Sequence, residues 1–352
     1  MNFAETTRTA YPEPDGEPIR STPRAEPPSK SEPPSSALKN EIIATKLVGI
    51  RFGARNINLY EFEALDGRSL PSVTPGSHID LHLPNGLVRQ YSLLRTGPTP
   101  KSYLIGVKRD ENSRGGSSFL HEQIRVGATL NIGNPRNNFP LAEGAEHNVL
   151  IAGGIGITPI WCMWSALKQR GSSVELIYSC RTRAEALFIN ELNASDKVAL
   201  NFDDENPNRV LDLGQVLSRV PKHSHLFCCG PTPMLKAFEV ASENWAPHQV
   251  HVEYFTPAAD AALDGGFTVE LARAGKEVRI MPGQSILGAL RDAGIDAAYS
   301  CEEGICGACM TTVISGIPDH RDSVLTPSER TSGKKIMICC SGSKTDRLVL
   351  DL

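Results

Sequence analysis

Four cysteines near the C-terminus constrain this chain more than any other feature. Cys301, Cys306, Cys309 and Cys339 are separated by four, two and 29 residues, which is the plant-type spacing for a [2Fe–2S] cluster held by thiolates. The stretch 300–309 reads SCEEGICGAC, and its small residues let backbone amides turn inward to hydrogen-bond the sulfur atoms. The spacing therefore predicts a one-electron iron–sulfur centre with these four cysteines as its metal ligands.

A structural zinc site, or thiols that cluster by chance, is the alternative for these cysteines. Zinc sites usually take their ligands as two C-x2-C pairs, whereas here one short pair follows a single cysteine and precedes a distant one. Cys340 directly follows Cys339, and on a strand adjacent side chains point to opposite faces, so only one of the two would face the cluster. We expect no disulfides, because the N-terminus does not resemble a secretory signal and thiolate ligands suit a reducing compartment.

Composition limits the classes of partner. The chain has 352 residues, enough for two or three domains, and its formal net charge of −4 provides no basic field. We therefore expect no nucleic acid or membrane partner. Residues 1–40 hold eight of the 25 prolines among Ser, Thr, Glu and Arg, which predicts a disordered tail. The tail resembles neither a signal peptide nor a transit peptide, so a cytoplasmic protein is the expectation.

One uncharged stretch, residues 148–167, is long enough to span a bilayer. Glycines interrupt it directly after an apolar run at 149–152 that has the length of a buried strand. Thr158 and Pro159 then have the character of an N-cap and a first helical position. We therefore interpret the stretch as a strand, a glycine turn and a helix.

The periodicity of apolar residues divides the remaining chain into three domains. Residues 41–145 contain short alternating runs between Pro and Gly turns, which predicts a small antiparallel β-barrel. Residues 146–256 alternate strands with helices, including helices from 159, at 184–192 and after 231, which predicts an α/β domain with a parallel sheet. After a linker at 257–265, residues 266–352 predict a compact α+β domain. Its helix, 285–293, stops at Gly294, and one of its strands is 335–339.

Two small-residue turns in the 146–256 segment fit a bound nucleotide. The sequence GGIGITP at 153–159 joins a strand to a helix, where glycines let the backbone approach a pyrophosphate and the helix N-terminus supplies amides. An ordinary βα turn is the alternative, because isolated glycine fingerprints have many false positives. The sequence CGPTPM at 229–234 forms a second such turn, and in a parallel sheet both turns lie at the same edge.

Two motifs in the 41–145 segment fit a flavin. Residues 89–92 read RQYS on a strand and residues 114–118 read RGGSS on a loop. An aromatic ring can pack against a flavin, while arginine, serine hydroxyls and loop amides hold a phosphate. Taken alone, each motif also fits a half-exposed barrel strand or an ordinary turn.

In chain order, these motifs resemble the phthalate dioxygenase reductase and vanillate O-demethylase reductase family across residues 41–352. The matching sequences are RxYS at 89–92, RGGS at 114–117, the turn at 153–159, CGP at 229–231, Glu253-x-Phe255 and the C-terminal cysteine set. The resemblance implies a ferredoxin-reductase-like barrel that binds FMN, an NAD-binding domain and a β-grasp ferredoxin domain.

The resemblance also implies the residues at each cofactor. The FMN contacts would be Arg89, Tyr91, Ser92, Val107, Lys108, Gly115, Gly116 and Ser117, with Phe255 over one face of the ring. The nicotinamide nucleotide would be lined by Gly154, Gly156, Thr158, Cys229 and Gly230. The family's Cys-x-Ser segment aligns its ligand with Cys339. Cys340 would then be a non-ligand.

We expect an enzyme in which electrons pass from NADH through FMN to the [2Fe–2S] cluster. The resemblance implies that they continue to a separate Rieske-type non-haem iron oxygenase, a transient partner. We assign no catalytic acid or base, because in hydride transfer the cofactors carry the chemistry and the site supplies proximity and water exclusion. Cys229 is expected only to pack beside the nicotinamide, Cys162, Cys180 and Cys228 to lie in the core, and His223 and His225 to flank a strand at the surface.

The choice of nucleotide and two other functions remain open at this stage. Arg181 and Arg183 follow the second parallel strand, where arginine can neutralise a 2′-phosphate, but NADH is the expectation. One alternative is an FAD-containing, NADPH-linked reductase of the phenylacetyl-CoA epoxidase type. The other is a non-enzymatic [2Fe–2S] electron carrier.

Overall fold

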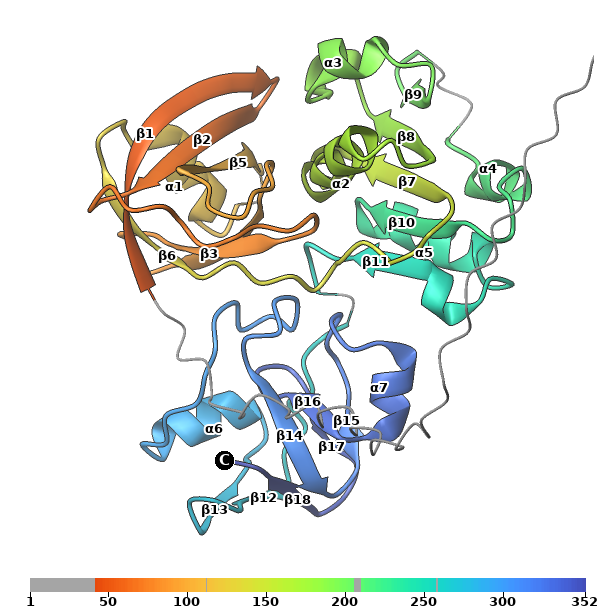
Figure 1. The fold of residues 1–352 in the computed structure, drawn as a ribbon. Coiled ribbons are helices and arrows are strands. Elements are labelled where there is room, and N and C mark those ends of the chain that lie inside the picture. The colour runs from red at the N-terminus through yellow and green to blue at the C-terminus, as the bar shows by residue number, and fades with distance from the viewer. Residues whose placement is uncertain (1–41, 112, 206–209, 258) are drawn as a thin grey trace, which may run out of the picture. The chain divides into compact units, whose positions relative to one another are not determined.

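The computed structural model describes residues 42–111, 113–205, 210–257 and 259–352. The predicted tail, 1–40, lies outside these residues. Three larger sheets follow one another along the chain, and a two-stranded sheet accompanies the third (Figure 1). The predicted fold class, an antiparallel flavin sheet, a parallel nucleotide sheet and a mixed ferredoxin-like sheet, is confirmed.

The first sheet is antiparallel and curls into a barrel. Its strands are β1 (Ile42–Ala54), β2 (Ile57–Ala64), β3 (His78–His82), β4 (Val88–Ser92), β5 (Ser102–Lys108) and β6 (Thr129–Gly133), in the order β4-β3-β6-β1-β2-β5. The two ends of the sheet meet just beyond β4, where Leu93 forms a backbone bridge with Ile105. Helix α1 (Gly116–Glu122) packs on this sheet through Leu120, whose carbonyl accepts a hydrogen bond from Tyr60 Oη at 2.8 Å.

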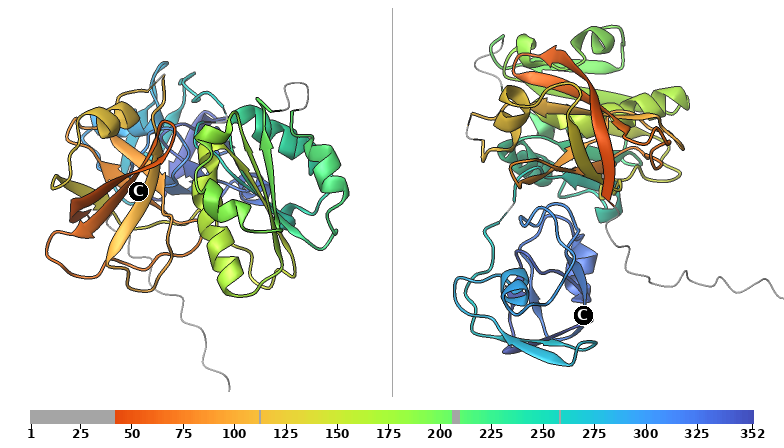
Figure 2. Two further views of the ribbon diagram at one scale, coloured as in Figure 1. Left: turned by 90° about the horizontal axis from the view of Figure 1, so that it is seen from above. Right: turned by 90° about the vertical axis from the view of Figure 1, so that its left-hand side faces the viewer.

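The second sheet is parallel and has helices on both faces (Figure 2, left). Its strands are β7 (Asn148–Gly153), β8 (Val174–Cys180), β9 (Val198–Phe202), β10 (His225–Cys229) and β11 (Val250–Glu253), in the order β11-β10-β7-β8-β9. Alternation along β7 explains the two layers. Leu150 packs with α2 (Ile157–Gln169), whereas Val149 packs with α4 (Leu213–Ser218) and α5 (Thr232–Ala241).

Two helix predictions in this segment are wrong in detail. Helix α2 begins at Ile157 and not at Pro159, because Gly154–Gly156 wind a 3-10 turn, η1, that starts the helix early. The helix predicted at 184–192 is broken into a 3-10 turn, η2 (Arg183–Glu185), and α3 (Ile189–Asn193). The break falls at Phe188, whose φ of 62° is incompatible with a helix and whose ring stacks on Trp161 at 4.2 Å.

Strand β9 and helix α4 were not predicted. They lie on either side of the undescribed residues 206–209, and the five-residue VALNF sequence of β9 is too short to stand out by periodicity. A further 3-10 turn, η3 (Pro247–Gln249), leads into β11.

The third sheet is mixed, with the order β13-β12-β18-β14-β16. These strands are β12 (Thr268–Leu271), β13 (Lys276–Arg279), β14 (Met310–Ser315), β16 (Lys335–Met337) and β18 (Arg347–Leu350); β15 (Pro318–Asp319) pairs separately with β17 (Gly342–Ser343). The predicted helix is confirmed as α6 (Ile286–Asp292): Ser285 Oγ caps it by accepting from the Gly288 amide at 3.0 Å, and Gly294 follows with a φ of 68°. Helix α7 (Pro327–Ser332) starts with a capping box of Thr326 and Glu329.

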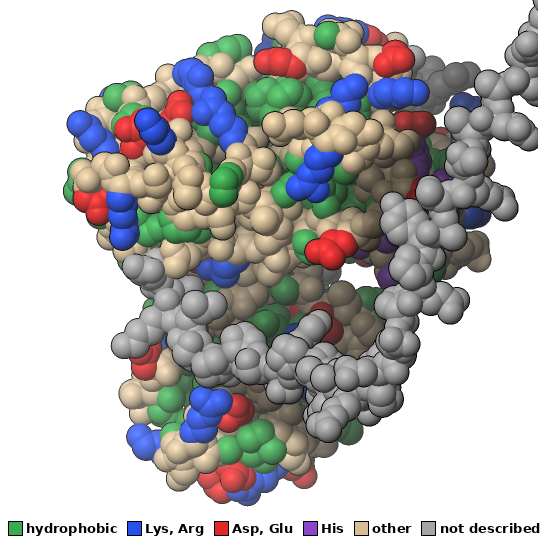
Figure 3. Space-filling view, viewed as in Figure 1, with side chains coloured by type: hydrophobic (Ala, Val, Ile, Leu, Met, Phe, Trp, Pro, Cys, Tyr) green, Lys and Arg blue, Asp and Glu red, His purple; other side chains and the backbone are tan. Residues whose placement is uncertain are grey.

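The surface carries charges of both signs. On the face drawn in Figure 3, basic and acidic side chains are interspersed. Within the described ranges, no helix combines the length and apolar character needed to cross a bilayer.

Candidate functional site

The four predicted cluster ligands converge. All four are buried, and their thiols interact with one another. Cys301 accepts hydrogen bonds from the thiols of Cys306 and Cys339, which lowers its pKa. The Cys339 thiol also lies against Cys309, and this interaction lowers the pKa of Cys309. The result is a continuous chain of four sulfur atoms.

Backbone amides also reach this group of thiols. The amide of Glu303 lies 3.3 Å from Cys301 Sγ, and that of Ala308 lies 3.5 Å from Cys306 Sγ. Across the part of the chain that the structure describes, no three His, Cys, Asp or Glu side chains surround one point as the ligands of a single ion do. A [2Fe–2S] cluster distributes its four thiolates over two irons, so a chain of thiols fits it better than it fits tetrahedral zinc.

The prediction that Cys339 and Cys340 lie on a strand is wrong. Strand β16 ends at Met337, and the three residues that follow form a turn. Both cysteines are buried, but only Cys339 bonds to the predicted ligands Cys301 and Cys309. Cys340 Sγ instead lies where a side chain on Gly304 would be, 2.5 Å from the position of a Cβ atom. Because of this turn, Cys339 faces the other predicted ligands and Cys340 faces Gly304.

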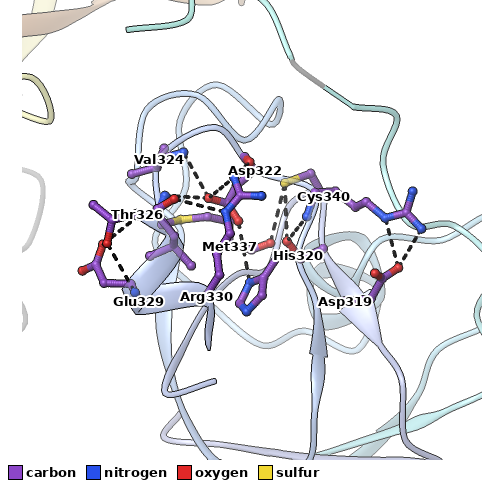
Figure 4. A network of polar contacts seen from close by, with 12 residues as sticks. Asp319, His320, Asp322, Val324, Thr326, Glu329, Arg330, Met337 and Cys340 are labelled. Carbon is purple, nitrogen blue, oxygen red and sulfur yellow. Dashed lines mark hydrogen bonds and ion pairs between the residues drawn. The ribbon is translucent and has the colours of Figure 1, made fainter. Parts of the chain in front are cut away.

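A polar network centred on Asp322 (Figure 4) contacts the loop between Cys301 and Cys306. The buried Asp322 carboxylate accepts hydrogen bonds from the amides of Val324 and Leu325 at 3.0 and 2.8 Å. Arg330 donates to the carbonyl of Asp322 and, at 3.1 Å, to that of Leu325. The amide that follows Asp322 donates to the carbonyl of Gly304 at 2.8 Å. The network thereby fixes the turn between Cys301 and Cys306.

A cavity of about 530 Å³ lies against the barrel motifs, a volume typical of cofactor sites. Eight of the predicted cofactor residues line it: Arg89, Tyr91, Ser92, Lys108, Gly116, Ser117, Thr158 and Phe255. Six predicted residues are not in its lining: Val107, Gly115, Gly154, Gly156, Cys229 and Gly230. Val107 is buried in the barrel core, and its carbonyl accepts from His121 at 2.9 Å.

One end of the cavity can bind an anion. Arg89 lies against the start of α1, with its guanidinium hydrogen-bonded to the carbonyls of Val88 at 2.8 Å and Arg114 at 3.3 Å. A Cβ on Gly116 would come 2.8 Å from Arg89 Cγ, so this close approach requires glycine. Ser117 Oγ adds a hydroxyl to the same cavity. An arginine beside hydroxyl groups suits a phosphate.

The cavity wall also holds a polar group without a partner. His78 is 5% exposed, and within the described residues neither of its ring nitrogens has a hydrogen-bond partner. Burial lowers its pKa to about 4, so the imidazole is neutral at pH 7. Buried polar atoms are nearly always satisfied, and His78 therefore fits a ligand with a polar edge, such as the isoalloxazine ring. Sequence analysis did not single out this residue.

The two glycine turns of the parallel sheet touch each other, as their position at one sheet edge predicts. A Cβ on Gly153 would lie 3.2 Å from the Cα of Gly230. A Cβ on Gly156 would overlap the carbonyl of Cys229. The backbones pack this closely only because the residues are glycine.

A buried thiol and carboxyl group meet beside these turns. Cys229 is 0% exposed and its thiol bonds to the Glu253 carboxylate. Desolvation raises the pKa of Cys229 and raises that of Glu253 to about 8. Glu253 lines the cavity, and its Oε2 has no partner among the described residues. Sequence analysis quoted Glu253 within a motif but gave it no role; its signal was an acidic residue at the end of a buried parallel strand.

The two arginines after β8 have different environments. Arg183 pairs with Glu205 at 3.0 Å, and its guanidinium lies 4.4 Å above the ring of Phe202. Arg181 lines the cavity.

The remaining cysteines and histidines lie away from the cavity. Cys162, Cys180 and Cys228 are buried in the core, as predicted. The side chain of His225 is not isolated: its Nδ1 lies 3.1 Å from His251 Nε2, and its ring centroid lies 6.1 Å from that of His248. Sequence analysis missed this contact because the three histidines come from separate elements.

A flavin-sized cavity, a parallel nucleotide-type sheet and a cluster of four thiols together define a redox protein with several cofactors. Comparison with known proteins agrees. The model of the 2Fe-2S iron-sulfur cluster binding domain matches residues 269–343, and that of the oxidoreductase NAD-binding domain matches residues 150–239.

Curated relatives match over nearly the whole chain. Phenoxybenzoate dioxygenase subunit beta of Ectopseudomonas oleovorans is 44% identical over 90% of this chain and 100% of its own length. Vanillate O-demethylase oxidoreductase of Pseudomonas sp. (strain HR199 / DSM 7063) is 41% identical over 88% of this chain and 100% of its own.

Solved structures also match over most of this chain. Phthalate dioxygenase reductase, described as a modular structure for electron transfer from pyridine nucleotides to [2Fe-2S], is 36% identical with a TM-score of 0.65, over 88% of this chain and 98% of its own. An intact type IV self-sufficient cytochrome P450 monooxygenase is 37% identical with a TM-score of 0.82 over 88% of this chain. The chain spans only 41% of that protein.

The chain therefore belongs to the phthalate dioxygenase reductase and vanillate O-demethylase reductase family, which confirms the resemblance seen in its motifs. It is a pyridine-nucleotide-dependent flavin and iron–sulfur oxidoreductase, the reductase component of an oxygenase system.

Proposed function

We propose that this reductase takes electrons from NADH and delivers them, through FMN and a [2Fe–2S] cluster, to a Rieske-type oxygenase. One observation carries the proposal. The cavity lined by the barrel motifs is also lined by Glu303 and Ile305 from the loop between the cluster cysteines. A flavin in this cavity would therefore lie beside the cluster.

The electron balance requires both cofactors. NADH and two oxidised one-electron acceptors give NAD⁺, H⁺ and two reduced acceptors. A bound flavin supplies the exchange between two-electron and one-electron chemistry. The protein contributes proximity, orientation and exclusion of water.

We assign the cofactor residues as follows. FMN is held by Arg89, Tyr91, Ser92, Val107, Lys108, Gly115, Gly116 and Ser117, with Phe255 covering one face; Val107 and Gly115, which are not in the cavity lining, would contribute backbone groups. The nicotinamide nucleotide is bound by Gly154, Gly156, Thr158, Cys229 and Gly230. The cluster is held by Cys301, Cys306, Cys309 and Cys339. The corresponding domains are 41–145, 146–256 and 266–352, with a linker at 257–265.

NADH is the preferred donor because Glu205 forms an ion pair with Arg183. The ion pair at 3.0 Å neutralises the guanidinium that would otherwise attract a 2′-phosphate. Glu205→Gln should therefore raise kcat/KM for NADPH several-fold and change that for NADH less than twofold. Steady-state kinetics with both nucleotides measure this, and Glu191→Gln on α3 is the control. A wild-type protein that strongly prefers NADPH would contradict the assignment.

The cofactors are tested directly. The anaerobically purified protein should release FMN on denaturation, identified by chromatography, and contain two irons per chain, with cluster absorbance bleached by NADH. Release of FAD together with NADPH preference would favour the epoxidase-type alternative. Cluster bands without flavin, and no reduction by NADH, would favour an electron carrier.

The partner and the compartment follow from the same proposal. A Rieske-type oxygenase would accept electrons in a transient complex and would contain the site for the organic substrate. A cytoplasmic location would keep the cluster thiolates in a reducing environment and would supply NADH. Reduction of the purified oxygenase by NADH, only when this protein is present, tests the pairing.

A further inference from the structure

Three polar contacts join the barrel to the loop that contains the first three cluster cysteines. Gln90 Nε2 donates to Ser300 Oγ at 2.9 Å. Asn138 Nδ2 donates to the carbonyl of Cys306 at 2.9 Å. Arg114 forms a two-point ion pair with Glu303, one arm of which measures 2.9 Å. We call these three pairs the barrel–loop contact.

A buried ion pair on the barrel side orients Gln90. Arg136 donates two hydrogen bonds of 2.7 Å to Asp80, whose side chain is 2% exposed. Asp80 in turn accepts from Gln90 Nε2 at 2.8 Å. A bidentate arginine–carboxylate pair is geometrically specific. The Gln90 amide is therefore held in the orientation that reaches Ser300, the residue directly before Cys301.

The second pair depends on close approach of the Asn138 side chain to the backbone at Gly307. A Cβ on Gly307 would lie 3.2 Å from Asn138 Nδ2, tighter than an ordinary contact. Gly307 also has a φ of 73°, which favours glycine. The glycine between Cys306 and Cys309 thus leaves room for Asn138 to reach the Cys306 carbonyl.

Each pair touches a cysteine ligand or an immediate neighbour of one. Ser300 precedes Cys301, the Glu303 amide donates to Cys301 Sγ, and the Cys306 carbonyl belongs to a ligand itself. The same barrel strand that provides Gln90 carries Arg89 and Tyr91 at the flavin cavity. A displacement of the loop from the barrel would therefore change the separation of the two cofactor sites. It would also move Glu303 and Ile305 away from the cavity wall, while the barrel residues of the cavity stay in place.

We propose that Gln90 and Asn138 are positioning residues that clamp the cluster loop against the barrel, so that electrons pass efficiently between the two cofactors. The inference rests on the proposed function. Asn138 does not line the flavin cavity; Gln90 does, but its amide nitrogen is engaged by Asp80 and Ser300. Their role is to fix a distance on which the rate of one internal step depends.

The test uses the full-length holoprotein and the double variant Gln90→Met/Asn138→Asp. Methionine keeps the length of Gln90 without its donor, and aspartate places an acceptor against the Cys306 carbonyl. Asn131→Asp, at an exposed position on β6 of the same sheet, controls for the added charge. Flavin and iron contents are measured first. Activity is then followed with ferricyanide, which accepts electrons directly from the flavin, and with cytochrome c, which accepts them after the cluster.

We expect ferricyanide reduction within twofold of the wild type and cytochrome c reduction slower by about tenfold. Independently of activity, amide hydrogen exchange should become faster across residues 300–309, while the cluster midpoint potential stays unchanged. The proposed clamp would be contradicted by equal cytochrome c reduction rates and equal amide hydrogen exchange in the variant and the wild type. It would also be contradicted if ferricyanide and cytochrome c reduction fell in parallel. A wild-type protein that lacks flavin or iron would instead overturn the proposed function.

Discussion

At the scale of single residues, the spacing of the cysteines predicts the cluster ligands. Cys339 differs from its neighbour Cys340 in that its thiol interacts with Cys301 and Cys309. Cys301 is the thiol to which Cys306 and Cys339 both bond. It is therefore one of two thiols, with Cys339 as the other, that interact with two further predicted ligands. Its loss should have the clearest consequence for electron flow.

Cys301→Ser should abolish cytochrome c reduction, by about 100-fold or more, because a hydroxyl is a poor substitute for a thiolate ligand. Direct ferricyanide reduction should remain within about twofold, since the barrel cavity is formed without this side chain. Both assays use NADH as donor. Cys340→Ser, next to a predicted ligand, is the matched control and should retain the cluster. Loss of both activities in Cys301→Ser would show that the cluster does not lie after the flavin.

At the scale of elements, the two turns that end β7 and β10 depend on each other. Gly156 has a backbone conformation that any residue adopts, yet its Cα faces the carbonyl of Cys229 without room for a Cβ. The constraint is therefore steric. It lies in the packing of one turn on another.

Gly156→Ala should separate these turns. Overpacking of this kind costs about 1–3 kcal/mol of stability, and it should raise KM for NADH because the proposed nucleotide site is displaced. Thermal unfolding and steady-state kinetics measure the two effects. Gly49→Ala is the control, because a Cβ there meets nothing closer than Glu61 Cβ at 3.9 Å. An unchanged KM with full stability would remove Gly156 from the nucleotide site.

At the scale of the whole molecule, the stability of the parallel sheet should depend on pH through its histidines. His251 stacks on Phe227 at 4.3 Å and contacts His225, with His248 nearby. Burial is the largest cause that lowers the pKa of His251 to about 4, and repulsion from His225 and His248 adds to it. The folded state therefore favours the neutral ring.

The stabilisation from a neutral His251 should be complete above pH 6.5 and decline as the pH falls from 6.5 towards 4. Each unit of pKa difference corresponds to about 1.4 kcal/mol. The urea midpoint should accordingly fall between pH 7.5 and 5. The fall should be smaller in His251→Phe, which keeps the ring stack, and unchanged in His223→Ala, an exposed control. An identical pH dependence in wild type and His251→Phe would contradict this assignment.

The sequence by itself determined the features that depend on neighbours along the chain. These are the cysteine spacing, the strand periods, the glycine turns and the caps of α6. Only the tertiary structure decided which distant groups meet. Gln90 reaches Ser300 across 210 positions and Asn138 reaches Cys306 across 168, and Cys229 finds Glu253 through the pairing of β10 with β11. Local patterns encode backbone conformation, whereas these contacts arise from the packing of whole sheets and loops, for which a single sequence carries no periodic signal.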